Sequence, residues 1–488
     1  MIIICISMFV KFFSKFDHLP GPKRNSFILG NADILKSGVK RTGNLGVVLL
    51  ELTLQYGDVF ILWRATEATV VTTDLPTVKE YYTNLKLFKK PNEATLNKIG
   101  RTNFVGKHSI LSDVGGPNWE RKKRIMDPGF KVSRLQDHIA KFYLIGEQVA
   151  DDLESRQLQN GLVDFRQVIA PYTIHAISSA GFSVTEEKAL KELSVGTSKI
   201  EDYWERRITE RNPWRNTKLA VILGLDHPLR PIAENQLKQI RELGQRIIMD
   251  RIEGEQLGKA NDALDFVIRA NEENGKLQME RCLDDFMAMY AAGNVTTATT
   301  LQFFIAEMIR NVDIQETLAK EVDEIWVGRG ISRNSSNEEI VSALKDMVYM
   351  DAVLNETLRH HPPIVVGLRT LQQDTKILNY NIPKGASCMV SQHTLHHLPQ
   401  HWDNPDSFDP SRFLGNTKIV PYSFGPFIVG PRRCLGKNFA LLEMKVFIAI
   451  WLSKMTFERL PADTEEILTK QSILVSVLDS RVIVKERI

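Results

Sequence analysis

The stretch FIVGPRRCLGKNFALLEMKVFIAIW, from Phe427 to Trp451, joins a glycine- and arginine-rich loop to a long apolar run. The apolar run predicts a buried helix, and Cys434 stands at its start. Backbone N–H groups and the helix dipole at such a position lower the pKa of a thiol and favour the thiolate that a metal requires. Gly430 and Gly436 allow the backbone to pass close to a large, flat group. The stretch therefore predicts a loop that presents Cys434 as a ligand.

Composition sets the frame for the rest of the chain. With 488 residues and 43% hydrophobic content, one large domain with a substantial core is expected. Lys and Arg total 62 against 59 for Asp and Glu, and this net charge of +3 gives no signal for nucleic-acid binding. The four cysteines (Cys5, Cys282, Cys388 and Cys434) are scattered, so we expect no disulfide framework and a reducing compartment.

The N-terminal residues 1–18 form a short hydrophobic segment. Its apolar run is shorter than the about 20 residues that a spanning helix needs, which favours a shallow membrane anchor over a full span. Aromatic and basic side chains follow the run and are expected at the membrane interface: Lys11, Phe12, Phe13, Lys15 and Phe16. A frayed tail is an equally open interpretation. The segment LPGPKR at 19–24 predicts a stiff hinge into a catalytic domain at 25–488.

The pattern along the chain predicts a mainly α fold with a small β region. Strand-like residues occur from Val59 to Thr73 and again from Val365 to Val390, where Asn381, Pro383 and Gly385 indicate turns. Between about Ser133 and Met350 the apolar residues recur at helical spacing. The region from Pro399 to Pro431 is rich in Pro and Asp and predicts irregular structure.

Two further segments carry candidate site residues. Glu356 and Arg359 in VLNETLRHHPP lie three residues apart on one helix face, which allows an ion pair, although such pairs are usually ordinary solvated features. AAGNVTTATT, from Ala291 to Thr300, lies in a proline-free helical run from about Asp284 to Asn311, about 40 Å long. Taken alone, its small residues and threonines favour a packing seam.

At every fixed place, Phe427, Gly430, Arg432, Cys434 and Gly436 match FxxGxRxCxG, so the loop resembles the cysteine loop of the cytochrome P450 family. The resemblance implies the P450 fold around one haem b (iron-protoporphyrin IX), with Cys434 as the axial ligand of the iron. It also implies that Arg432 contacts a haem propionate and that Phe427 packs beside the sulfur. The competing interpretation is an inert buried cysteine in a glycine-rich turn.

The resemblance extends to the other motifs in the family's order. FDPSRF at 408–413 resembles the family's PERF-type segment, so Arg412 is expected to join Glu356 and Arg359 in a buried triad. Gly293 is expected to leave room at the haem face. Thr296, with Thr297 and Asn294 nearby, is expected to deliver protons during oxygen activation. Val295 departs from the family, which usually has an acid at this position, and this puts efficient coupling in doubt.

A haem cradle is also implied by resemblance. It would contain Trp119, Lys123 and Arg369 beside Arg432, with Lys123 at a position where the family usually has Arg. Histidines at 393, 396, 397 and 401 have spacings that a zinc site could use, but matches to the family favour structural roles.

The resemblance implies a haem-thiolate monooxygenase that uses O2 and an apolar small-molecule substrate. Electrons would come from NADPH through a flavin reductase on a basic face (Lys122, Lys123, Arg124, Lys131, Arg433 and Lys437). Similarity to the animal cholesterol 24-hydroxylase branch suggests a sterol-like substrate between Val365–Leu368, the 94–111 loop and Met287–Thr297, and the cytoplasmic face of the endoplasmic reticulum membrane. The alternatives are a reductase-independent isomerase or peroxygenase, and a non-catalytic haem- or lipid-binding protein.

Overall fold

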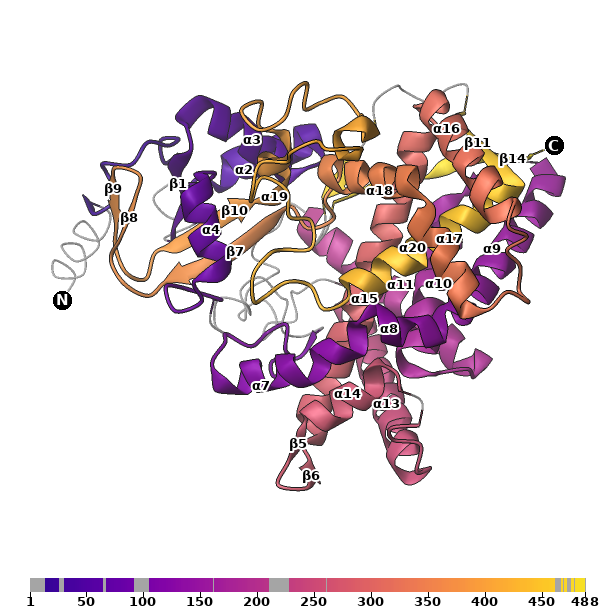
Figure 1. The fold of residues 1–488 in the computed structure, drawn as a ribbon. Coiled ribbons are helices and arrows are strands. Elements are labelled where there is room, and N and C mark those ends of the chain that lie inside the picture. Colours follow the sequence, from indigo (N-terminus) through magenta and orange to yellow (C-terminus); the bar gives the residue numbers. More distant parts are fainter. Residues whose placement is uncertain are drawn as a thin grey trace. The chain divides into compact units, whose positions relative to one another are not determined.

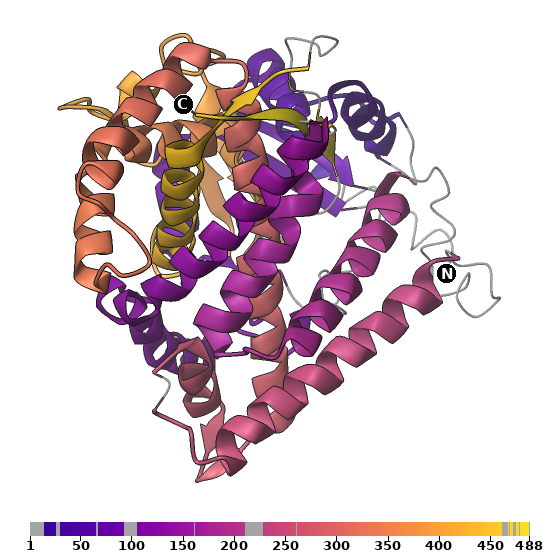
Figure 2. The ribbon, with the colours of Figure 1, turned by 90° about the vertical axis from the view of Figure 1, so that its right-hand side faces the viewer.

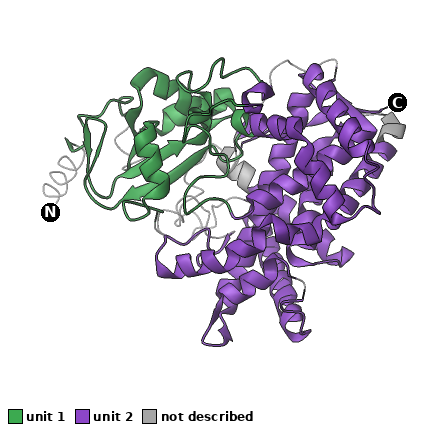
Figure 3. Ribbon diagram, viewed as in Figure 1, with its two compact units in different colours: residues 1–95, 358–409, 416–434 green, residues 96–357, 410–415, 435–488 purple. Residues whose placement is uncertain are grey.

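The computed structural model describes residues 14–25, 30–64, 67–91, 105–160, 162–209, 228–259, 261–460, 467, 469–471, 475–477 and 479–487. The chain divides into two compact units (Figure 3). Unit 1 comprises residues 1–95, 358–409 and 416–434, and unit 2 comprises residues 96–357, 410–415 and 435–488. Within the described residues, every helix is too short or too polar to cross a membrane.

Unit 1 is built on a five-stranded sheet in the order β1-β2-β10-β7-β3 (Figure 1). Only β2 and β10 pair in parallel, while the other neighbours are antiparallel. The strands are β1 (Val59–Arg64), β2 (Glu67–Thr72), β3 (Phe88–Lys89), β7 (Val366–Leu371) and β10 (Ser387–Ser391), with a separate hairpin of β8 (Thr375–Ile377) and β9 (Tyr380–Ile382). The helices of unit 1 are α2 (Ala32–Thr42), α3 (Leu45–Tyr56), α4 (Leu75–Thr83) and α19 (Gln392–His397).

The two strand regions expected from the sequence are confirmed, but one turn was placed wrongly. Asn381 lies within β9, and the reversal occurs three residues earlier, where Leu378 has a left-handed φ of 50°. Gly385, with φ 87°, lies in the turn before β10, as predicted. The long stretch before the cysteine loop is irregular, as expected, apart from the short η6 helix (Pro410–Phe413).

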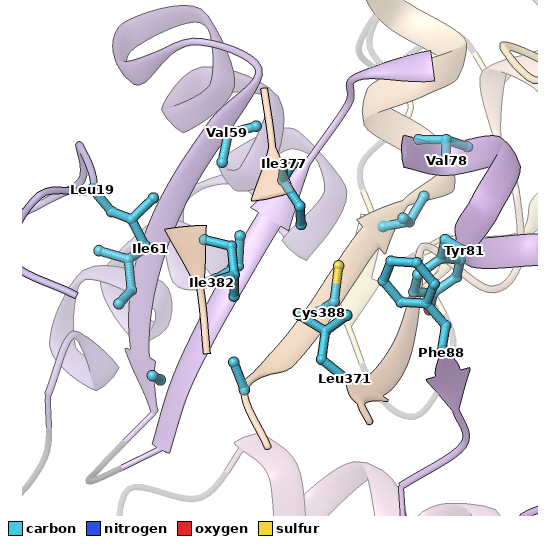
Figure 4. Packing of buried hydrophobic residues seen from close by; sticks show 14 of the residues in the cluster. Leu19, Val59, Ile61, Val78, Tyr81, Phe88, Leu371, Ile377, Ile382 and Cys388 are labelled. Carbon is cyan, nitrogen blue, oxygen red and sulfur yellow. The ribbon is translucent and has the colours of Figure 1, made fainter. Parts of the chain in front are cut away.

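The core of unit 1 gathers apolar side chains from the sheet and from α4 (Figure 4). Phe16 is buried in this core and meets Trp63 edge to face, with 5.7 Å between ring centroids. The prediction that Phe16 lies at a membrane interface is therefore wrong, because the sheet offers its ring an apolar partner. The rest of the predicted anchor, residues 1–13, lies outside the described residues.

The segment predicted as a hinge, residues 19–24, lies along β1. The carbonyl of Pro20 accepts a hydrogen bond from the Ile61 N–H at 2.9 Å. A side chain on Gly21 would collide with the Ile61 carbonyl, since its Cβ would lie 2.4 Å from that oxygen. The guanidinium of Arg24 lies over the Trp63 ring at 4.6 Å. The sheet thus holds these residues in place.

Unit 2 is mainly helical, which confirms the fold class expected from the sequence. Its helices are α7 (Pro117–Met126), α8 (Val132–Leu135), α9 (Ile139–Asn160), α10 (Phe165–Ala176), α11 (Glu187–Thr209), α13 (Arg230–Glu253), α14 (Ala263–Ala270), α15 (Met279–Met308), α16 (Val312–Val322), α17 (Asn337–Asp346) and α20 (Lys437–Lys454). Short π and 3-10 turns accompany them: η1 (Asp127–Phe130), η2 (Gln136–His138), η3 (Ile177–Gly181) and η5 (Asp323–Val327). Helix α18 (Val348–His360) begins in unit 2 and ends in unit 1.

Small strands complete unit 2. They are β4 (Leu162–Asp164), β5 (Glu272–Glu273), β6 (Lys276–Leu277), β11 (Met455–Glu458), β12 (Thr469–Gln471), β13 (Val475–Val477) and β14 (Arg481–Glu486). β14 joins β11 and β4 in one three-stranded sheet.

Helix α15 is the central element of unit 2. It packs against α10, α13 and α14, and Figure 2 shows α11 and α13 side by side next to it. The helix covers most of the proline-free run expected from the sequence, beginning five residues earlier, at Met279, and ending three residues earlier, at Met308. Its buried positions include polar residues as well as apolar ones (Asp284, Asp285, Asn294 and Thr297). Buried polar groups need partners, so α15 carries the hydrogen-bond networks described below.

Candidate functional site

The cysteine loop in unit 1 is fixed by its own backbone. The N–H of Cys434 donates to the Phe427 carbonyl at 2.8 Å, and the N–H of Arg433 donates to the Gly430 carbonyl at 3.0 Å. Cys434 is exposed and belongs to no disulfide among the described cysteines. It lies three residues before α20, close to the predicted start of the helix. The loop therefore presents the thiol from a backbone whose hydrogen bonds are made within the loop itself.

The two loop glycines differ in what their backbone requires. Gly430 has φ 77°, and a Cβ there would lie 2.6 Å from the Tyr82 carbonyl. The predicted close approach is thus observed, and its partner is the backbone of α4. Gly436 has φ −80°, a conformation open to any residue, and serves as the N-cap of α20. The structure gives no backbone reason for glycine at this second position.

Burial separates Cys434 from the other described cysteines. Burial raises the pKa of Cys388 to about 12, so its sulfur is a thiol near neutral pH. Burial likewise raises the pKa of Cys282 well above its usual value. Neither buried sulfur favours the thiolate that a metal requires, whereas Cys434 is exposed.

Arg369, on β7, supplies a buried cation within unit 1. Its Nη1 donates to the Leu368 carbonyl at 2.9 Å, and the guanidinium lies over the Tyr81 ring at 5.1 Å. Among the described residues, its buried Nε has no hydrogen-bond partner. A buried guanidinium with an unused donor suits a carboxylate, such as the propionate of a haem. This observation fits the cofactor that the sequence suggests.

The predicted triad is seen in two parts. In unit 2, Arg412 Nε lies 3.4 Å from Glu356 Oε1, and the carboxylate is fully buried. In unit 1, the buried guanidinium of Arg359 donates to three backbone carbonyls, those of His396, Pro405 and Ser407, at 2.8, 2.8 and 3.0 Å. The sequence did not indicate these carbonyl partners, because they follow 37 to 48 residues later, in α19 and in the irregular segment after it.

The histidines of α19 have structural surroundings. The Gly425 N–H donates to Nε2 of His396 at 3.2 Å, which leaves Nδ1 as the donor to the Arg359 carbonyl at 3.1 Å. Burial lowers the pKa of His396 to about 3, so the ring is neutral. His393 and His397 stack with their ring centroids 4.1 Å apart. Both nitrogens of His396 bind backbone, which agrees with the structural role expected.

Thr296 and its neighbours on α15 point in different directions. The hydroxyl of Thr296 donates to the Ala292 carbonyl at 2.7 Å, within the helix. Thr297 is buried, and its hydroxyl has no hydrogen-bond partner among the described residues. Asn294 accepts a hydrogen bond from the Thr173 hydroxyl of α10 at 2.6 Å. The Asn294 amide thus bonds a neighbouring helix, and its assistance to Thr296 stays a prediction.

Gly293 has a packing role on α15. A Cβ at this position would lie 3.0 Å from Cδ1 of Ile177 in η3. This is a close contact between two elements of unit 2, and the expectation that Gly293 leaves room at a haem face stays a prediction. The signal that could have found it is the one the sequence offered as an alternative, a seam of small residues.

Helix α7 presents fewer basic groups than expected. Trp119 is buried, and Lys123 Nζ lies 3.1 Å from Asp127, the first residue of η1. Lys122 is almost fully buried and paired with Asp285 at 2.7 Å, so the expectation that it belongs to an exposed basic face was wrong. Arg124, Lys131 and Lys437 are exposed in unit 2. Asn438 donates to the Phe130 carbonyl at 3.1 Å, which brings the start of α20 beside Lys131.

Comparisons with known proteins agree with this arrangement. The family model described as Cytochrome P450 matches residues 20–485. The chain is 25% identical over 428 residues to cytochrome P450 3A6 of Oryctolagus cuniculus, covering 84% of this chain and 81% of that protein. It is also 25% identical to the probable cytochrome P450 4s3 of Drosophila melanogaster, over 93% and 89% of the two chains. A cytokinin hydroxylase of Arabidopsis thaliana is likewise 25% identical, over 83% and 76%. The chain belongs to the cytochrome P450 family, whose members are oxidoreductase monooxygenases that bind haem through a cysteine thiolate.

Proposed function

We propose that Cys434 is the axial thiolate ligand of a haem b, and that this protein inserts one oxygen atom from O2 into a C–H bond of an apolar small molecule. The observation that carries the proposal is the cysteine loop, in which an exposed thiol is held by the 2.8 Å bond from its own N–H to the Phe427 carbonyl. A ligand held by backbone is preorganised for metal binding.

The residues that would hold the haem follow from the surroundings described above. Arg369 offers a buried, unused N–H donor to a propionate, and Arg432 of the loop would be a second cationic contact. Trp119 and Lys123 of α7 would complete the cradle, with the Lys123 ammonium shared with Asp127. When bound, a thiolate-ligated haem supplies activated oxygen for the insertion. Phe427, Gly430 and Gly436 would shape the loop that presents Cys434 to the haem.

Thr296 is proposed to hold and pass a proton during oxygen activation, assisted by Thr297. The hydroxyl of Thr296 now donates to the Ala292 carbonyl at 2.7 Å. Its oxygen can also accept a hydrogen bond from a water molecule that supplies the proton. Val295 provides no carboxylate beside it, so this proton supply depends on hydroxyl groups and water.

The proposed substrate is apolar and sterol-like, on the similarity of residues 286–311 and 119–130 to the cholesterol 24-hydroxylase branch. Electrons would come from NADPH through a flavin reductase that docks on the exposed basic residues Arg124, Lys131 and Lys437. The apolar N-terminal run supports a location at the cytoplasmic face of the endoplasmic reticulum membrane.

Val295 favours one second candidate, a haem-thiolate isomerase or peroxygenase that needs no reductase. Product formation that requires both NADPH and the reductase would support the monooxygenase. Product formation with hydrogen peroxide alone would support the second candidate. Bound haem or lipid without any turnover would instead indicate a non-catalytic carrier.

The ferrous carbon-monoxide difference spectrum tests the cysteine ligand directly. Wild type is expected to give the red-shifted band of a thiolate ligand, and Cys434→Ala is expected to lose it. Cys388→Ala is the matched control, because it also removes one sulfur from unit 1, at a fully buried position in the sheet. A band that survives in Cys434→Ala would contradict the proposal.

A further inference from the structure

Two adjacent acids on α15 hold a loop that lies far away in the sequence. Asp284 Oδ2 accepts a hydrogen bond from the His108 N–H at 3.0 Å, and Asp285 Oδ1 accepts one from the Ile110 N–H at 2.5 Å. Both carboxylates are almost fully buried, with 2% and 0% of each residue exposed. The partners lie about 175 residues apart in the chain. The loop at 105–112 is thus bound through its backbone to the helix.

Each of the two carboxylates also meets groups from other helices of unit 2. Asp285 Oδ2 accepts from Lys122 Nζ of α7 at 2.7 Å and from Asn271 Nδ2 at 2.7 Å. Asp284 Oδ1 accepts from Arg241 Nη1 of α13 at 2.8 Å. Figure 1 shows α7, α13 and α14 around the same end of α15. The acids therefore join the loop to several elements at once.

The loop itself is shaped to lie on these acids. Lys122 Nζ, besides pairing with Asp285, donates to the His108 carbonyl at 3.1 Å, so His108 is bound through both its N–H and its carbonyl. Gly106 has φ 72°, and a Cβ there would lie 2.1 Å from the Asp284 carboxyl carbon. The Ser112 hydroxyl donates to the Gly106 carbonyl at 2.7 Å and closes the turn. Only glycine at position 106 permits the close approach to the Asp284 carboxylate.

We infer that Asp284 and Asp285 are positioning residues that fix the 105–112 loop on the helix carrying Thr296, and thereby set how tightly and in which orientation substrate is held. Thr296 lies about 17 Å further along the same helix. A buried ion pair adds little net stability compared with apolar packing, and its best attested use is to fix one arrangement among several. The consequence for substrate rests on the proposed function, together with the sequence-based expectation that the 94–111 loop, which overlaps residues 105–112, lines the substrate pocket.

The experiment compares Asp284→Asn and Asp285→Asn with wild type and with Asp265→Asn. Asp265 is the matched control, because it is equally buried in unit 2 and pairs with Arg251 at 2.6 Å, but its hydrogen bonds among the described residues go to partners outside 105–112. Hydrogen exchange at the amides of His108 and Ile110 reports on the loop. The absorbance shift on titration with cholesterol reports on substrate binding, and the carbon-monoxide spectrum reports on the haem ligand.

Asp284→Asn is expected to speed hydrogen exchange at the His108 amide by about tenfold or more, and Asp285→Asn at the Ile110 amide. Both variants are expected to weaken cholesterol binding by about tenfold. Asp265→Asn is expected to lower the melting temperature and leave both readouts within about twofold of wild type. Gly106→Ala, which disturbs the contact from the loop side, is expected to resemble Asp284→Asn.

Faster exchange with unchanged cholesterol affinity would overturn the positioning role. Unchanged exchange in both Asp284→Asn and Asp285→Asn would overturn it as well. The same holds if all three Asn variants differ from wild type only in melting temperature. If wild type showed no thiolate band, the proposed function would be refuted. The exchange result would then decide only whether the acids anchor the loop.

Discussion

At the scale of single residues, the conformation of Gly430 decides whether Cys434 can stand where it does. Its left-handed φ and the 2.6 Å from a built Cβ to the Tyr82 carbonyl exclude any side chain. We expect Gly430→Ala to destabilise the loop by about 1–3 kcal/mol and to lower both haem content and the thiolate band. Haem content and the carbon-monoxide spectrum of purified protein measure these effects.

Gly385→Ala controls for backbone strain alone. Gly385 also lies in unit 1 with a left-handed φ of 87°, but a Cβ there would meet nothing within 4 Å. The difference between the two variants isolates the collision with the Tyr82 carbonyl. Equal haem content in both variants would contradict the importance of that close approach.

Val295 is the residue at which this chain departs from its family, and it precedes Thr296 on α15. A carboxylate placed there can relay protons to the hydroxyl. We therefore expect Val295→Glu to raise the product formed per NADPH consumed by roughly twofold or more. Val295→Gln introduces a side chain of the same size as Glu but without the carboxylate. It should therefore leave the product formed per NADPH consumed unchanged. An unchanged ratio in Val295→Glu would show that proton supply does not limit coupling.

At this scale, a residue's role was predictable from the sequence where its neighbours in the chain demand that residue type. The loop from Phe427 to Gly436 is local, and its expected backbone constraints appear at Gly430. The burial of Lys122 could not be predicted, because its partner Asp285 follows 163 residues later. A lysine amid basic residues is expected to be solvated until a distant acid is known to meet it.

At the scale of elements, the helix α19 carries a pH-dependent contribution to stability. Burial lowers the pKa of His396 to about 3, against 6.5 for the free side chain. Between about pH 3 and pH 6.5, the unfolded chain therefore binds a proton at this ring that the folded chain does not bind. The contribution is fully present above pH 6.5 and is lost as the pH falls towards 3.

We accordingly expect His396→Gln, which cannot titrate, to reduce the fall in unfolding free energy between about pH 7 and about pH 5. Urea unfolding at several pH values measures the slope. His401→Gln is the control, since that ring is only half-buried and its pKa is less strongly lowered by burial. His396→Gln is expected to be less stable than wild type at neutral pH, because it loses the hydrogen bonds to the backbone of Arg359 and Gly425. Equal slopes in wild type and His396→Gln would refute the assignment.

Elements were predicted from the sequence where one periodic signal persists. The proline-free run gave α15 with its ends displaced by a few residues, and branched residues gave β1 and β2. What an element packs against was not predictable in the same way. Asn294 and Gly293 lie one after the other on α15, yet one bonds α10 and the other contacts η3. Those contacts depend on where other helices lie, which the local pattern does not contain.

At the scale of the whole molecule, the net charge of +3 is small for 488 residues. Long-range attraction of an acidic reductase must then come from local groups, such as the exposed Arg124, Lys131 and Lys437 of unit 2. Lys131 and Lys437 are neighbours through the bond from Asn438 to Phe130. The whole-chain composition thus excludes general steering and leaves a defined patch to test.

We expect Lys437→Glu to raise the reductase concentration needed for half-maximal turnover by about fivefold at low ionic strength. The effect should shrink as salt is added, because screening acts over about 10 Å at 0.1 M ionic strength. Turnover titrated with reductase at several salt concentrations measures both expectations. Lys188→Glu on α11 changes the net charge equally, at an exposed position outside the patch, and should leave the titration near that of wild type. If both variants weakened the interaction alike, net charge would govern the encounter, and a specific docking patch would be refuted.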